Sequence, residues 1–86
     1  MSQIIAFEIY RTEKLSINGE SFTVQFTKRR DTHEYALFAV NEAATKSWRS
    51  FYSAELAADF KHSTGRQLEE EVFAVLKGDI ERGNLQ

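Results

Sequence analysis

The hydrophobic positions of the chain follow two different periods. Apolar and polar side chains alternate through the first half, which is typical of β-strands, whereas residues 66–82 repeat at the helical period. No linker, low-complexity tract or internal repeat divides the chain. The pattern therefore predicts one α+β domain over residues 1–86, in which an antiparallel sheet of three or four strands is packed by one or two C-terminal helices.

The pair Asn18-Gly19 predicts a tight β-hairpin, because both residues tolerate the positive φ angles of a type I′ turn. A two-residue turn sets the register of the two strands, so that Leu15 pairs with Phe22. The second strand is then expected to place Phe22, Val24 and Phe26 in the core and Ser21, Thr23, Gln25 and Thr27 in solvent.

The first strand has an interrupted apolar pattern. Residues of one parity are expected on the buried side, namely Ile5, Phe7, Ile9, Leu15 and Ile17. The charged Arg11 and Glu13 share that parity. One inserted residue would turn both charges outward, so we expect a bend or a bulge near residues 11–14. In residues 33–40 both parities are apolar, which predicts a central strand.

The C-terminal segment 66–82 is predicted to be an amphipathic helix. Thr64 and Gln67 have the spacing of a capping box, and Gly83 is a suitable stop. Its apolar arc holds Leu68, Val72, Val75, Leu76 and Ile80, with Phe73 at the edge.

The stretch "KSWRSFYSAELAADF", residues 46–60, is compatible with two structures. Its aromatic residues have the spacing of one helical stripe. Its first part is also rich in residues that favour sheet, and Ser53 is a good helix start. We favour a fourth strand that ends at Tyr52, followed by a short helix over residues 54–62 and a break at Thr64-Gly65; a single helix is the alternative.

Composition limits the function. The net charge of −2 provides no global field that would attract nucleic acid or an acidic membrane. The absence of cysteine removes disulfides and thiolate chemistry. Without the pattern of a signal peptide or an apolar run of about 20 residues, we expect a soluble cytoplasmic protein with no membrane partner.

Sequence motifs for catalysis are missing. The chain has no Gly-x-Ser-x-Gly elbow, no His-Glu-x-x-His pair and no glycine-rich phosphate loop. Glu55, Asp59 and His62 have a spacing that places them on one helical face, but a charged outer surface explains them better than a metal site does. We expect no enzyme activity, no cofactor and no metal.

Six residues are the candidate partner-binding set. A basic tip is formed by Lys28, Arg29 and Arg30, and the fourth strand adds Trp48, Arg49 and Tyr52. Aromatic surplus without a catalytic pattern favours a small module that acts through protein–protein contact, either with itself as a homodimer or with a larger partner. Small compact proteins without a catalytic pattern also serve as inhibitors of host machinery, and this association adds such a role to the expectations. The alternative is a nucleic-acid-binding protein that uses the basic hairpin tip and the sheet face.

Overall fold

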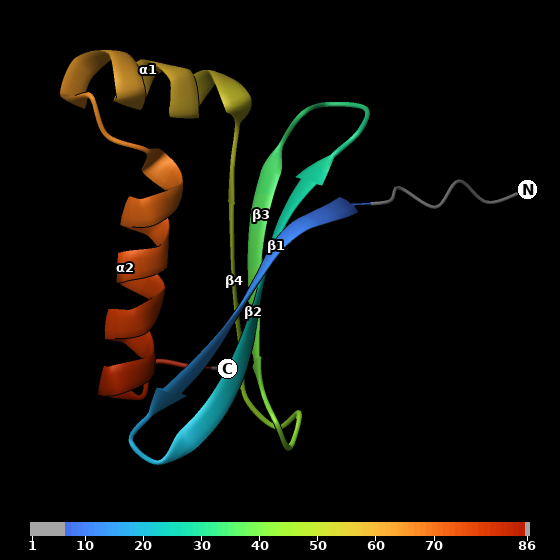
Figure 1. Cartoon of the computed structure of the whole chain (residues 1–86), viewed down its shortest axis with the longest axis vertical. Helices are drawn as coiled ribbons and strands as arrows, with labels where there is room; N and C mark the ends of the chain where they lie inside the picture. The colour runs from blue at the N-terminus through green and yellow to red at the C-terminus, as the bar shows by residue number, and fades with distance from the viewer. Residues whose placement is uncertain (1–6, 86) are drawn as a thin grey trace, which may run out of the picture.

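The computed structural model describes residues 7–85 as a four-stranded antiparallel sheet followed by two helices (Figure 1). The sheet is a simple meander in the order β1-β2-β3-β4. The elements are β1 (Phe7–Ile17), β2 (Glu20–Arg29), β3 (Tyr35–Asn41), β4 (Ser47–Tyr52), α1 (Ala54–Thr64) and α2 (Leu68–Arg82). The α+β prediction is confirmed, with four strands and two helices.

The β1–β2 hairpin has the predicted turn and register. Asn18 and Gly19 have φ angles of 53° and 77°, as the turn requires. Leu15 pairs with Phe22, and Arg11 pairs with Phe26. The turn chemistry therefore fixes how β1 lies on β2.

The irregularity of β1 is a bulge at Tyr10, which lies before the predicted segment. Ile9 pairs with Thr27 and Arg11 pairs with Phe26, so that Tyr10 is the extra residue. The prediction for the charged side chains is wrong, because Arg11 stays on the helix side, where its guanidinium lies 4.3 Å from the centre of the Phe26 ring.

The apolar residues that precede the bulge take the opposite face from the one predicted. The Phe7 ring lies 5.8 Å from that of Phe38, on the side of the sheet away from α2, and Ile9 is 54% exposed on the same side. The extra residue at the bulge resets the alternation, so these two residues leave the core side. Ile5 lies outside the described residues.

The core lies between the sheet and α2. Phe22, Val24 and Phe26 are buried as predicted. Thr27, which was expected in solvent, is buried instead, because it lies between Ile9 and Ala36 and its hydroxyl donates to the Ala36 carbonyl at 2.9 Å. The remaining core residues are Leu37, Ala39, Tyr52, Phe73, Leu76 and Ile80.

The ambiguous stretch 46–60 is a strand followed by a helix. The Ser53 hydroxyl caps α1 by accepting from the Leu56 amide at 3.0 Å. Gly65 ends α1 in the left-handed conformation, with φ at 74°. None of the residues of α1 is buried, and Figure 1 shows this helix lying across the N-terminal end of α2.

Two details of α2 differ from the prediction. Thr64 does not cap it: its hydroxyl donates to the Phe60 carbonyl and accepts from the Arg66 amide, which closes α1. The apolar arc is also rotated, because Phe73 faces the core whereas Val75 is 55% exposed. Gly83 ends the helix as predicted.

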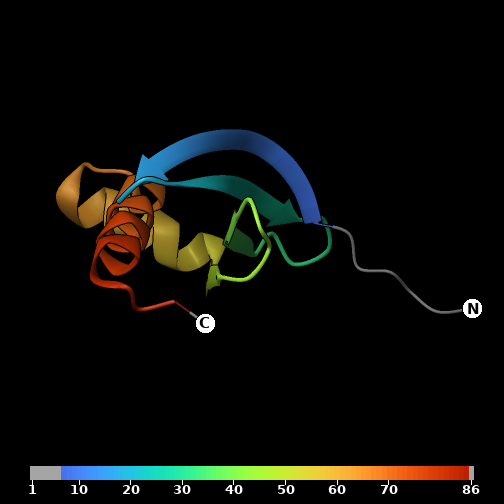
Figure 2. The same ribbon diagram turned by 90° about the horizontal axis from the view of Figure 1, so that it is seen from below.

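The molecule is a two-layer structure. Figure 2 shows β1 arching over the helices, which lie together on one side of the sheet. A bulge increases local bend and twist, which accounts for part of this curvature. Among the described residues, no helix is long and apolar enough to cross a membrane.

Candidate functional site

The sheet has one face covered by α2 and one face without a covering helix, which we call the open face. Strand alternation and the bulge decide which side chains lie on it. The open face comprises Phe7, Ile9, Thr12, Lys14 and Ser16 of β1, Ser21, Thr23, Gln25, Thr27 and Arg29 of β2, Ala36, Phe38 and Val40 of β3, and Ser47, Arg49 and Phe51 of β4.

Three phenylalanine rings from three strands gather on the open face. The Phe38 ring lies 5.8 Å from the ring of Phe7 and 5.8 Å from that of Phe51, in both cases edge to face. Phe51 remains 49% exposed despite these contacts. Soluble proteins usually cover such rings, so this partly exposed group is a candidate contact surface.

The charge of the open face differs in sign from that of the whole chain. Its strand positions include Lys14, Arg29 and Arg49 but no Asp or Glu. Arg49 forms no ion pair with any other residue in the described range, whereas Arg29 is held by Asp31 at 2.7 Å. Glu42 lies at the far end, where its amide donates to the Ser21 carbonyl.

A shallow groove crosses the open face beside the aromatic rings. It has a volume of about 260 Å³. Its lining holds both polar and apolar residues: Thr23, Gln25, Phe38, Ala39, Val40, Ser47, Trp48 and Arg49. Hydroxyl, amide and guanidinium donors therefore lie next to an apolar platform.

A second hollow, which we call the basic hollow, lies at the end of the sheet where β2 turns into β3. It has a volume of about 400 Å³ and is lined by Glu8, Tyr10, Lys28, Arg29, Arg30, His33 and Tyr35. His33 has a positive φ of 59°, and the loop is closed by the Arg29 amide, which donates to the Glu34 carbonyl at 2.8 Å.

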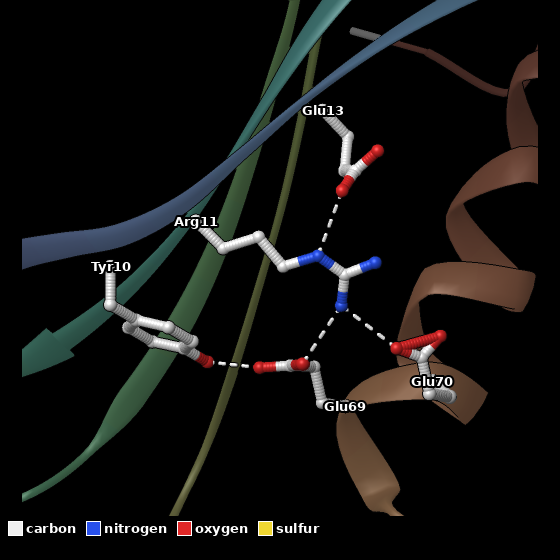
Figure 3. Close-up of polar contacts among 5 residues, drawn as sticks. All are labelled: Tyr10, Arg11, Glu13, Glu69 and Glu70. Carbon is white, nitrogen blue, oxygen red and sulfur yellow. Dashed lines mark hydrogen bonds and ion pairs between the residues drawn. The ribbon is translucent and has the colours of Figure 1, made fainter.

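The opposite face of the sheet holds an acidic cluster built around Arg11 (Figure 3). The Arg11 guanidinium contacts Glu13 at 2.9 Å, Glu69 at 3.0 Å and Glu70 at 2.8 Å, and the Tyr10 hydroxyl donates to Glu69. Burial, together with the carboxylate of Glu69, raises the pKa of Tyr10. The cluster joins β1 to the start of α2, and we interpret it as structural.

The structure does not bring the six predicted site residues together on one surface. Arg29 and Arg49 lie on the open face, and Lys28 and Arg30 line the basic hollow. Trp48 and Tyr52 face α2: the Trp48 indole donates to Asp79 at 2.8 Å, and Tyr52 is buried.

Sequence analysis did not identify Phe7, Phe38 and Phe51 as candidate site residues. Phe7 has the parity of the core, and the bulge that moves it to the open face has no sequence signal as clear as that of the turn. Phe38 and Phe51 directly follow or precede the core residues Leu37 and Tyr52 in their strands. Strand alternation therefore places both rings on the face opposite the core, and this was the signal in the sequence that could have identified them.

Comparison of the chain with protein-family models, with curated proteins and with solved structures gives no match.

Proposed function

We propose that the protein binds single-stranded nucleic acid on the open face of its sheet. The observation that supports this best is the combination, on one face of an acidic protein, of three clustered phenylalanines and three cations with no carboxylate on any strand position. Aromatic side chains and cations on one surface are the two components with which proteins bind single strands.

The aromatic component accounts for contact with bases. Unpaired bases expose apolar ring faces, and stacking of a base on an aromatic side chain contributes about 1–3 kcal/mol. Phe51 presents the most accessible aromatic surface, at 49% exposure. It is therefore the residue on which we expect a base to stack.

The cationic component accounts for contact with phosphates. Lys14, Arg29 and Arg49 lie on three different strands, so they span the width of the face. The carboxylates of the Arg11 cluster lie on the other face, where they would repel a polyanion. The charge distribution thus favours one side of the sheet for a nucleic acid.

Fluorescence anisotropy with a single-stranded oligonucleotide of about 12 nucleotides tests the proposal. Phe51→Ala is expected to weaken binding at least about fivefold, as the loss of one stacked base implies. Two of the open-face cations, Lys14 and Arg49, form no ion pair within the described residues, whereas Arg29 is paired with Asp31 and Glu34. With about two phosphates neutralised, the logarithm of affinity should fall with the logarithm of salt concentration at a slope of about −1.4. Arg49→Gln should make that slope less steep by about 0.7.

Two control variants match these changes. Leu56→Ala removes an exposed apolar side chain from α1, and Lys61→Gln removes a positive charge from the same helix. Both should bind like the natural protein. Absence of binding at about 100 μM protein in roughly 50 mM salt would reject the proposal, since non-specific binders are detected under these conditions.

Protein–protein contact is the second candidate function. The exposed apolar residues Ile9, Val40 and Phe51 on the open face would suit a protein partner or a second copy of the chain. Such a contact is distinguished by its response to salt, because apolar burial is not weakened by added salt as phosphate contacts are. Sedimentation analysis of the natural protein and of Phe51→Ala tests the homodimer.

A further inference from the structure

The basic hollow is separate from the open face but shares one residue with it. Lys28 and Tyr35 pair across β2 and β3 on the helix side of the sheet, and both line the hollow. Arg29 lines the hollow as well, although its strand position belongs to the open face. A ligand that follows the open face toward the β2–β3 loop would therefore reach the hollow through Arg29.

The cations of the hollow differ in how firmly they are paired. Lys28 forms no ion pair within residues 7–85, and its ammonium lies 5.5 Å from the centre of the Tyr35 ring. Arg30 contacts Glu8 at 2.7 Å, but the side chains of this pair are 74% and 58% exposed. Exposed pairs contribute little to stability, so an incoming anion can replace Glu8 beside Arg30.

Glu8 competes with any anionic ligand for Arg30, so a ligand of the hollow must interact strongly with the cations to displace it. An internal phosphodiester has one negative charge, whereas a phosphate monoester has about −1.5 to −2 near neutral pH and three acceptor oxygens. A monoester therefore competes better with Glu8 for Arg30 while it also contacts Lys28. Tyr10 and Tyr35 supply an apolar wall beside these cations, with ring centres 6.3 Å apart.

We infer that the basic hollow binds a nucleotide phosphate monoester, which is the phosphorylated end of a strand bound on the open face. This inference rests on the proposed function. The same chemistry is also available from a free mononucleotide, so the two sources must be compared.

The experiment compares oligonucleotides of one sequence that differ only at their ends. Strands with a 5′-phosphate, a 3′-phosphate or hydroxyl groups at both ends are titrated by anisotropy, and free thymidine monophosphate is tested as a competitor. One phosphorylated end should bind about three- to tenfold more tightly than the hydroxyl-ended strand, as expected for added charge-assisted hydrogen bonds. Competition by the mononucleotide at similar concentration would assign the site to free nucleotides instead of strand ends.

Three variants locate the effect. Lys28→Gln should abolish the gain from the terminal phosphate, and Glu8→Gln should increase it because the competing carboxylate is removed. Lys61→Gln on α1 removes the same charge outside the hollow and should leave the gain unchanged.

The failures of the two proposals are distinguishable. Equal binding of all three strands, together with weaker binding by Phe51→Ala, would overturn the inference and leave the proposed function intact. A phosphate gain that persists in Lys28→Gln would also overturn it. Absence of binding by every strand would reject both.

Discussion

The two faces of the sheet are built from the same four strands but have opposite chemistry. The face toward α2 holds the buried core and, at its margin, the carboxylates that surround Arg11. The open face holds aromatic rings and cations and has no acidic strand residue. Adjacent residues of one strand therefore lie in different environments. Side chains on the first face are buried against α2, and for those on the second face we propose contact with a partner.

The largest expected difference between the faces is seen at two neighbours in β3. Leu37 is fully buried, so Leu37→Ala should reduce the free energy of unfolding by about 2–5 kcal/mol. Phe38 points to the open face, and Phe38→Ala should cost less, about 1–3 kcal/mol, since the ring is partly solvated and its two edge-to-face contacts contribute about 0.5–1.5 kcal/mol each. Urea unfolding of both variants measures the two values. Equal losses would mean that the open face is covered like the core.

A second prediction concerns the acidic cluster. Arg11→Met removes the cation and leaves Glu13, Glu69 and Glu70 near one another, so the free energy of unfolding should fall by about 1–2 kcal/mol, less in high salt. Arg30→Met is the matched control, because its pair with Glu8 is exposed and its loss should cost no more than about 0.5 kcal/mol. A similar effect of both changes in thermal unfolding would contradict the role of Arg11 in joining β1 to α2.

The contact between β4 and α2 makes stability depend on pH. The hydrogen bond from the Trp48 indole, and then Arg82, lower the pKa of Asp79 below its usual value near 3.8. A lowered pKa in the folded state stabilises the protein above the unfolded-state pKa, and this contribution disappears as pH falls through the folded-state pKa. Asp79→Asn should therefore lower the melting temperature at pH 7, and this difference should shrink as the pH falls below the usual carboxyl pKa. A difference that is constant with pH would exclude an electrostatic origin.

The smallest expected effect is on the open face itself. Val40 is 40% exposed, so Val40→Thr should change the free energy of unfolding by no more than about 0.5 kcal/mol. Ala39→Thr, at the neighbouring buried position, should cost more because a hydroxyl enters the core. Urea unfolding of the two threonine variants measures how each face of the sheet tolerates an added hydroxyl.

Local signals in the sequence predict most of the fold. The Asn18-Gly19 turn predicts the hairpin and its register, and Ser53 predicts the start of α1. The Ser53 side chain accepts a hydrogen bond from a backbone amide, and Asn18 and Gly19 permit positive φ angles. The residue type alone therefore determines the local structure at both places, so the sequence predicts it.

Features that depend on contacts distant in sequence were predicted less well. The residue at the bulge, Tyr10, donates a hydrogen bond to Glu69, which lies 59 residues away along the chain, and packs against Phe26. The same dependence explains the candidate site: alternation identifies Phe38 and Phe51 as opposite to the core, but only the bulge adds Phe7 to them.

The extra residue at Tyr10 has a consequence for how this chain tolerates insertions and deletions. Loss of one residue there would restore an uninterrupted alternation, which would either send Phe7 toward the helices or expel Arg11 and the residues after it from them. Length changes at this point should therefore be far more damaging than in the β2–β3 loop, where a gained or lost residue leaves both strands in phase.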